Sequence, residues 1–251
     1  MTSPSDRSMS ILGLAHAIQD GEEGLQYMHG LWRRHLLFDL LWFIKSGQTK
    51  KPSSERRTRS WSWQNVNGEV TQRLISSEKD VVGKERSLIK VAELVALKAG
   101  QDRPSEVFTE DRIMLKCPLL RCTNVFPSGE QMAIIELQTP EGRVEAIFAT
   151  DFSDIDEENL IGAEIIREVI FEDTKKRREE QKVREIAAIW SHGIVLQRNF
   201  TANELDVQVA YERVGRFWME WPLVRDEGDP RAGILSRRIL GRTKSYVIRI
   251  E

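Results

Sequence analysis

Ser60-Trp61-Ser62-Trp63 places two tryptophans one residue apart, and the rest of the fold can be worked out from it. Residues two apart in a strand point to the same face, so a strand here would put both indoles on one side. Side chains of such large apolar area need a cover. The preceding segment carries Trp32 and Trp42 and is the nearest candidate. We therefore expect tryptophans of an N-terminal segment to pack on the first strands of a sheet.

The first 47 residues read as helical. Residues 8–19 place apolar side chains on one side, and Asp20-Gly21 is a stop signal. From 22 to 45, apolar residues recur at steps of three and four, which is typical of a helical stripe. A second stripe makes the later half apolar most of the way round. We expect one long helix there, sandwiched between layers and ended by Ser46-Gly47.

After a basic loop at 48–59, the pattern changes to period two. Asn67-Gly68 is a hairpin signal and predicts that 60–66 pairs with 69–75. The dense charge run at 175–185 is interpreted as a solvated insertion, with Glu180 and Arg184 forming an i,i+4 pair if it is helical. Further strands are expected at 88–97, 112–117, 131–138, 143–149, 164–171, 210–218 and 245–250. Residues 186–197 form a long apolar segment broken by Ser191-His192-Gly193.

Helices followed by many strands with turns between them predict an α+β fold. In this prediction, N-terminal helices (1–47) pack on a mainly antiparallel, barrel- or sandwich-like β domain (60–251). The basic loop (48–59) joins the two, and they form one unit. The order of the strands in the sheet stays open.

Composition restricts the partners and the compartment. The net charge is −2, which gives no reason to expect nucleic acid as the main partner. Two cysteines, Cys117 and Cys122, suit a reducing compartment, and no histidine is spaced around them as zinc binding requires. The start shows no leader pattern, and the apolar stretch 36–44 is shorter than the roughly 20 residues of a membrane span. We expect an intracellular, cytoplasmic protein with protein partners of unknown identity.

Several motifs occur in a fixed order along the chain. They are Asp6-Arg7 with Gly13-Leu14-Ala15, Gly30-Leu31-Trp32, Leu40-Leu41-Trp42, the tryptophan stretch 59–65 followed by Gly68, Gly193-Ile194-Val195-Leu196, and Tyr211-Glu212-Arg213-Val214-Gly215-Arg216-Phe217. Together they resemble the region C-terminal to the catalytic-like module of fungal heterokaryon-incompatibility (HET) domain proteins. Arg59 replaces the usual proline, and Gln64-Asn65 replace Ala-Ser. The HET module itself, which lies upstream in such proteins, is absent from this sequence.

The resemblance implies a non-enzymatic regulatory or interaction region in fungal self/non-self recognition. It also singles out ten residues whose role is expected to be structural. They are Tyr27, Gly30, Trp32, Trp42, Trp61, Trp63, Gly68, Tyr211, Arg213 and Gly215. Two alternatives stay open. One is a hydrolase-like enzyme whose site assembles only in the fold, and the other is a truncated remnant without a present role.

Other constellations are interpreted as packing or solvated surface. Tyr211, Arg213 and Phe217 alternate, and a packing face is favoured over a ligand-binding face. Trp32, Trp42, Trp61 and Trp63 are assigned to the core, with an aromatic cage for a cation as the alternative.

The polar candidates are equally weak. The basic residues of 50–59 are interpreted as a solvated loop rather than a nucleic-acid contact. The acidic stretch 151–158 lacks the glycine and ligand spacing of a calcium loop. His192 has no nucleophile and orienting acid at a recognisable spacing. We therefore assign no catalytic residue, cofactor or metal.

Overall fold

The computed structural model describes most of the chain, and every structural statement below concerns the described residues. They are residues 4–21, 26–46, 59–66, 68–72, 85–95, 108–109, 112–129, 131–152, 155–175, 182–198, 210–221 and 244–250.

The protein is dominated by β-sheet. Within the described part of the chain, ten strands form one sheet, which is antiparallel except where β13 and β14 run parallel. Its strands are β5 (Glu85–Lys90), β6 (Glu93–Leu94), β7 (Phe108–Thr109), β8 (Arg112–Pro127), β9 (Met132–Thr139), β10 (Gly142–Thr150), β11 (Leu160–Lys175), β12 (Lys182–Arg198), β13 (Ala210–Glu220) and β14 (Ser245–Ile250). The expectation of a mainly antiparallel sheet after residue 60 is confirmed at this level.

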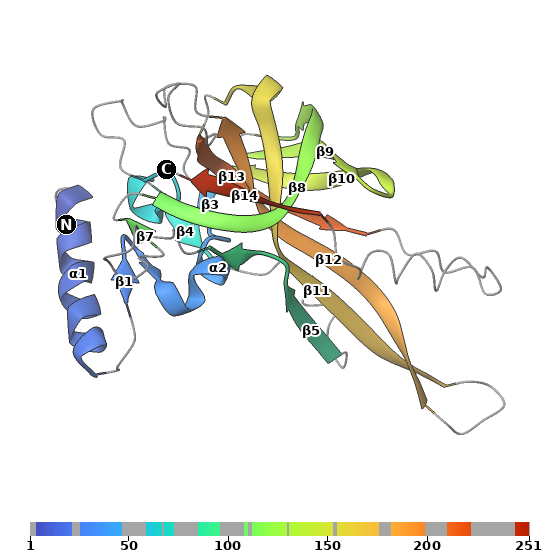
Figure 1. Ribbon diagram of the computed structural model, residues 1–251, viewed down its shortest axis with the longest axis horizontal. Coiled ribbons are helices and arrows are strands. Elements are labelled where there is room, and N and C mark those ends of the chain that lie inside the picture. Colours follow the sequence, from blue (N-terminus) through green and yellow to red (C-terminus); the bar gives the residue numbers. More distant parts are fainter. Residues whose placement is uncertain are drawn as a thin grey trace, which may run out of the picture.

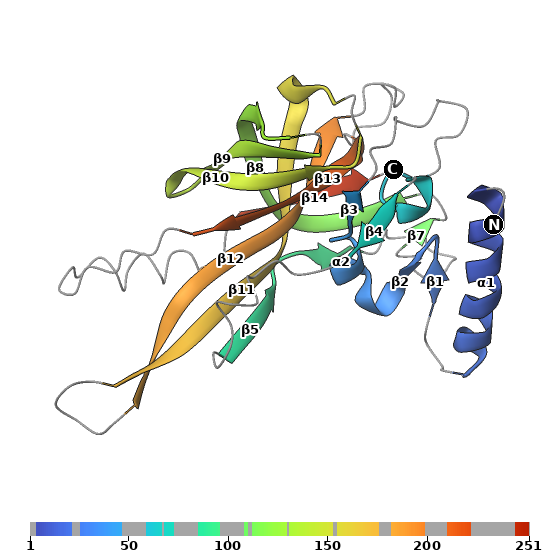
Figure 2. The same cartoon turned by 180° about the vertical axis from the view of Figure 1, so that it is seen from behind.

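The sheet closes on itself. From β8 the pairing runs through β9, β10, β13, β12 and β11, and β11 pairs again with β8 at residues 161–163. Figure 2 shows these strands wrapping round one another, while β11 and β12 extend as a long two-stranded arm. The expected charged insertion lies on this arm. Its central residues, 176–181, fall outside the described residues, whereas the backbone on both sides is strand, not helix.

Aromatic rings fill the inside of the closed sheet, and glycines make room for them. Phe217 and Phe148 are both fully buried in one apolar cluster. A Cβ at Gly193 would lie 2.4 Å from the Phe217 ring and 2.2 Å from the Ala163 carbonyl oxygen. At Gly193, β12 therefore approaches the Phe217 ring and β11 so closely that only glycine fits.

The N-terminal part of the chain, up to residue 72, forms a separate layer against this sheet (Figure 1). Its apolar core includes Leu36, Leu40, Trp42 and Trp61, which pack with sheet residues such as Ile165. Its elements are α1 (Pro4–Gly21), β1 (Tyr27–Met28), β2 (Leu31–Trp32), the 3₁₀ turn η1 (Arg33–His35), α2 (Leu36–Asp39), β3 (Phe43–Ser46), the 3₁₀ turn η3 (Trp63–Asn65) and β4 (Glu69–Thr71).

The predicted long helix at 22–45 is wrong, and so is the description of 1–47 as helical throughout. His29 and Gly30 have φ angles of 46° and 96°, and they form the two-residue turn of a hairpin in which Tyr27 pairs with Trp32. Positive φ at both central residues matches the twist of paired strands. The three-and-four spacing of apolar residues reflects burial on all sides of short elements rather than one helical face.

The predicted hairpin of 60–66 with 69–75 is also wrong. The Ser62 hydroxyl accepts the backbone N–H of Gln64 at 3.2 Å and so caps a 3₁₀ turn where a strand was expected. Glu69–Thr71 (β4) pairs instead with Phe43–Ser46 (β3). Trp61 and Trp63 therefore do not share a strand face. The basic loop lies mostly outside the described residues.

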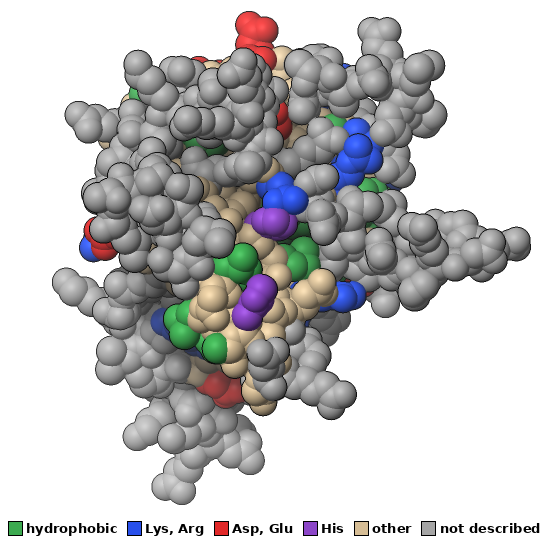
Figure 3. All heavy atoms as spheres, turned by 90° about the vertical axis from the view of Figure 1, so that its left-hand side faces the viewer, with side chains coloured by type: hydrophobic (Ala, Val, Ile, Leu, Met, Phe, Trp, Pro, Cys, Tyr) green, Lys and Arg blue, Asp and Glu red, His purple; other side chains and the backbone are tan. Residues whose placement is uncertain are grey.

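The first helix is where it was expected, but it does not pack on the sheet. α1 touches β1, and Ala15 is buried, whereas Leu12, Leu14 and Ile18 are exposed. Figure 3 shows hydrophobic side chains on the face that carries this helix. The expectation of N-terminal helices covering the sheet is corrected. The cover consists of α2, the short strands and residues 60–65, which we call the tryptophan turn.

The later strands follow the predicted pattern closely. The strands expected at 131–138 and 143–149 are present as β9 and β10 and form a hairpin, with Thr139 opposite Gly142. The expected strand at 88–97 is present as β5 and β6, separated at Val91 and Ala92. The other predicted strands, at 112–117, 164–171, 210–218 and 245–250, are each present and often longer. The apolar segment 186–197 also lies in a strand, β12, which continues through Ser191-His192-Gly193.

Replacing Gly193 by alanine should destabilise the protein, because its Cβ would overlap a backbone oxygen that cannot move away. We expect a loss of about 1–3 kcal/mol in the free energy of unfolding, measured by urea denaturation. Gly13→Ala is the matched control. It lies in α1 with open space around its Cβ position, and it should gain about 0.5–1 kcal/mol from helix propensity. Equal stability of Gly193→Ala and the wild type would contradict the close packing.

Candidate functional site

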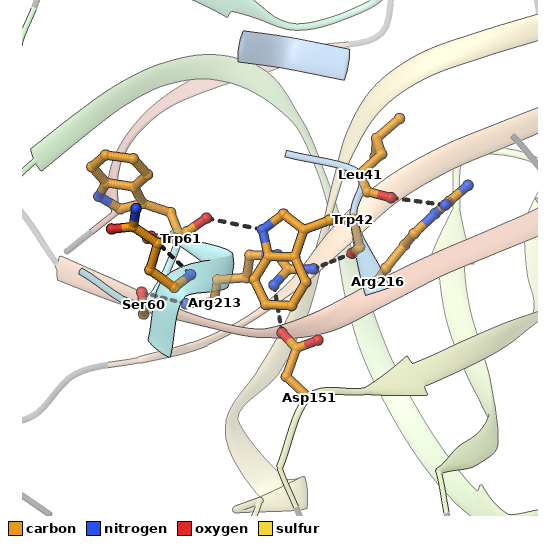
Figure 4. Close-up of polar contacts among 9 residues, drawn as sticks. Leu41, Trp42, Ser60, Trp61, Asp151, Arg213 and Arg216 are labelled. Carbon is orange, nitrogen blue, oxygen red and sulfur yellow. Dashed lines mark hydrogen bonds and ion pairs between the residues drawn. The ribbon is translucent and has the colours of Figure 1, made fainter. Parts of the chain in front are cut away.

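The polar centre of the molecule is Arg213 on β13, which is fully buried. One guanidinium nitrogen, Nη1, donates to the Asp151 carboxylate at 2.6 Å, and the other, Nη2, donates to the Trp42 backbone carbonyl at 2.5 Å. The guanidinium carbon also lies 3.4 Å from the centroid of the Trp42 ring. Figure 4 shows the guanidinium between the indole and the carboxylate. Arg213 thus holds the N-terminal layer to the sheet through its hydrogen bond to the Trp42 carbonyl and its contact with the face of the Trp42 ring, while Asp151 balances its charge.

The tryptophan turn joins the same centre. The Trp42 indole N–H donates to the Trp61 carbonyl at 3.0 Å, and the backbone N–H of Arg213 donates to the Ser60 hydroxyl at 2.9 Å (Figure 4). Trp61 is fully buried. Three segments that are far apart in sequence therefore meet in what we call the arginine junction: Leu41-Trp42, Ser60-Trp61 and Arg213, with Asp151.

A β-bulge gives Arg216 the same orientation as Arg213. Against β12, Val195 pairs with Gly215 and Leu196 pairs with Arg213, so Val214 is an extra residue. Arg216 consequently faces the N-terminal layer and donates to the Leu41 carbonyl at 2.8 Å. Phe217 points into the closed sheet. The expectation that Tyr211, Arg213 and Phe217 share one face is wrong, because the bulge reverses the alternation after Arg213.

Burial disfavours the charges of Asp151 and Arg213 in the arginine junction and of the neighbouring Arg216. It raises the pKa of Asp151 to about 6 even though Arg213 pulls that pKa down. It lowers the pKa of Arg213 to about 10, and it lowers the pKa of Arg216 to about 9 with Arg213 as a further cause. Each charge is still carried near neutral pH, where the ion pair and the carbonyl contacts offset the loss of water.

His192 lies in a second buried polar group. It is fully buried on β12, and its Nε2 lies 3.5 Å from Glu168, which also contacts Arg86 at 3.4 Å. Its Nδ1 lies 3.4 Å from Nη2 of Arg216. Burial is the main cause that lowers the pKa of His192, and Arg216 adds to it against the opposing effect of Glu168.

The serine beside His192 points elsewhere. The Ser191 hydroxyl donates to Glu164 at 2.5 Å and accepts the indole N–H of Trp221 at 2.7 Å. Glu164 in turn holds Arg167 by two hydrogen bonds, at 2.8 and 2.7 Å. Ser191 is therefore not in contact with the His192 ring, and a Ser-His-acid arrangement is not assembled from these residues.

The acidic stretch does not come together with His192. Asp151 belongs to the arginine junction, Asp154 lies outside the described residues, and Asp156 caps a 3₁₀ turn by accepting from Glu158 and Asn159. The Asn159 contact is the main cause that lowers the pKa of Asp156. No three His, Cys, Asp or Glu side chains gather to hold a metal in the described part of the chain.

The β1–β2 turn fixes Trp63 next to the arginine junction. The Trp63 indole N–H donates to the Gly30 carbonyl, and the Ser62 hydroxyl donates to the His29 carbonyl, both at 2.5 Å. A Cβ at Gly30 would lie 2.5 Å from the Trp63 ring, so this position needs glycine for its φ angle and for space.

A cavity of about 370 Å³ opens between this turn, α2 and β4. Trp32, Trp42 and Trp63 line it together with Asp39, whereas Trp61 is not among the lining residues. The aromatic set that the sequence suggested is thus split: three indoles share a cavity and the fourth is core.

Most of the ten signature residues lie in or beside these features. Tyr27 stacks edge-on against Trp32 with ring centroids 5.0 Å apart. A Cβ at Gly215 would lie 2.3 Å from the Ala149 carbonyl oxygen, and Tyr211 packs against the N-terminal core. Gly68 is half-buried, just before β4. Sequence reasoning missed Asp151, Arg216 and Asp39, since nothing local links an acidic residue to an arginine 62 positions away.

No family model, curated protein or solved structure matches this chain. Among the described helices, none has the length and apolar character needed to cross a membrane.

Breaking the buried ion pair from one side should be strongly destabilising. Arg213→Met leaves the Asp151 charge buried without its cation, and we expect a loss of about 3–5 kcal/mol in unfolding free energy. The double variant Arg213→Met/Asp151→Asn should lose less unfolding free energy than the two single variants lose in sum, by about 1–3 kcal/mol. The exposed pair Lys116–Glu93, at 3.2 Å, is the control, with an expected coupling below about 1 kcal/mol. Additive effects at Arg213 and Asp151 would contradict the pairing.

His192 should make stability depend on pH. Its pKa in the folded protein lies below the ordinary histidine value of 6.5, so the unfolded chain takes up a proton first as the pH falls. Stability is therefore lost on acidification below about pH 6.5, and His192→Gln should flatten the fall. Protonation of Asp151 acts in the opposite direction, because it adds stability as the pH falls from about 6 to 3.8. Asp151 is present in both proteins, so its contribution cancels when their pH profiles are compared. Identical pH profiles of unfolding free energy would contradict this account.

Proposed function

We propose that this chain is a non-enzymatic regulatory and interaction region of the heterokaryon-incompatibility type, acting through protein partners in fungal self/non-self recognition. The observation that supports it best is the arginine junction. The motifs behind the resemblance are scattered from Asp6 to Phe217, yet Trp42 is in direct contact with both Trp61 and Arg213. Motifs that recur in a fixed order are expected when they build one body, and contact between them supports that interpretation.

The buried polar groups favour a scaffold over a catalyst. Arg213 and Arg216 donate to backbone carbonyls of the N-terminal layer, and His192 is shielded from solvent. A general acid or base must reach the proton that it transfers, and a fully buried imidazole does not reach a substrate. These contacts explain why the residues are needed without assigning them a reaction.

The compartment belongs to the same proposal. Cys117 is buried, Cys122 is half-buried, and neither forms a disulfide. Burial raises the pKa of the Cys117 thiol to about 12, which keeps it protonated and unreactive. Two free thiols suit an intracellular, reducing location.

The proposal can be tested in a filamentous fungus that shows incompatibility. We expect the tagged chain to capture a defined set of proteins, and its expression to change the survival of fused cells from incompatible strains. Arg213→Met, which removes the hydrogen bond from Arg213 to the Trp42 carbonyl and the ion pair with Asp151, should lose both effects, whereas Gly13→Ala should keep them. Unchanged survival of fused cells together with no partner above the level of the Arg213→Met control would overturn the proposal.

A further inference from the structure

The cavity beside the arginine junction has the size of a small-ligand site. At about 370 Å³ it falls within the range of pockets that bind small molecules. Its wall is mostly apolar and aromatic, and its polar side chains are Asp39, Thr71 and Gln72. The residues that line it are Gly30, Leu31, Trp32, Asp39, Trp42, Trp63, Val70, Thr71 and Gln72.

Asp39 gives the cavity its charge. It is the ionisable side chain among the described lining residues, and it is half-buried at the end of α2. Its Oδ2 accepts the Trp32 backbone N–H at 2.9 Å, and its Oδ1 accepts the Gln72 amide at 3.1 Å. Both contacts fix the position of the carboxylate. A fixed negative charge in an apolar wall attracts cations and disfavours anions.

The indoles around this carboxylate are fixed in advance. Trp63 is held by its hydrogen bond to the Gly30 carbonyl, and Trp42 by its hydrogen bond to the Trp61 carbonyl. Trp32 packs edge-on against Tyr27. Side chains that are already ordered lose little entropy when a ligand binds. The Trp42 ring already carries the Arg213 guanidinium at 3.4 Å, which shows that an indole here is used to stabilise a positive charge.

We propose that this cavity binds a methylated ammonium group, carried either by a free small molecule or by a methylated lysine side chain. Such a cation is large and weakly hydrated, so indole faces and one carboxylate can replace its water shell. A compact inorganic cation would need several oxygen ligands, and among the described lining residues the carboxylate is Asp39 alone. The inference is independent of the function proposed above.

The decisive experiment compares choline with its neutral carbon isostere, 3,3-dimethylbutan-1-ol, by isothermal titration calorimetry on the wild-type chain. Shape and apolar area are nearly the same, so the difference reports the charge. We expect choline to bind at least about tenfold more tightly. Equal affinity, or no binding of choline at millimolar concentration, would overturn the proposal. N-acetyl-trimethyllysine amide as a third ligand separates the two sources: tighter binding than choline indicates a protein side chain, and weaker binding a free small molecule.

Variants locate the binding site. Asp39→Asn keeps the size of the side chain. It should weaken the binding of choline at least about tenfold and leave the affinity for the isostere unchanged. Glu93→Gln removes an equal charge from an exposed position outside the cavity and should change neither affinity. If Asp39→Asn does not fold, the wild-type comparison of choline with its isostere still decides. Equal choline affinity of a folded Asp39→Asn variant and the wild type would rule out this cavity.

Discussion

The structure depends on one buried guanidinium. Arg213 connects a sheet strand, the Asp151 carboxylate and the backbone of Trp42, and the Trp42 ring covers it. Arg213, Asp151 and Trp42 are all buried, so each partner is needed to offset the desolvation of the others. The N-terminal layer is made of short elements, which have little stability of their own. Its position is therefore set by the arginine junction together with the apolar core around it.

The β-bulge at Val214 makes this arrangement geometrically possible. Regular alternation would send Arg216 into the closed sheet, where Phe217 and Phe148 fill the space. One extra residue turns Arg216 toward Leu41 and turns Phe217 inward. The adjacent Gly215 lets β10 approach, because a Cβ there would overlap the Ala149 carbonyl oxygen. The segment 213–217 thus serves two cores at once, which gives a physical reason for its residue pattern.

Local patterns predicted the sheet but not the N-terminal layer. The β9–β10 hairpin was predictable because alternation and turn residues act over a few positions. The stretch 22–45 was not, because burial on every side of short elements gives the spacing of a helix, and the His29-Gly30 turn carries little signal without its φ angles. Asp151, Arg216 and Asp39 could not be assigned from the sequence, because their partners lie elsewhere along the chain. Trp32, Trp42, Trp61 and Trp63 were grouped as core residues, whereas Trp32, Trp42 and Trp63 line a cavity and Trp61 is fully buried.

Trp42 links the arginine junction to the cavity. Its ring covers Arg213, its N–H donates to the Trp61 carbonyl, its own carbonyl accepts from Arg213, and it also lines the cavity. A group bound against this indole cannot shift it without lengthening at least one of those contacts. Because the same contacts hold the N-terminal layer to the sheet, occupancy of the cavity and docking of the layer act on one side chain. A ligand that binds the cavity only while Trp42 holds this position would stabilise the docked layer, and that coupling would be reciprocal by thermodynamic necessity.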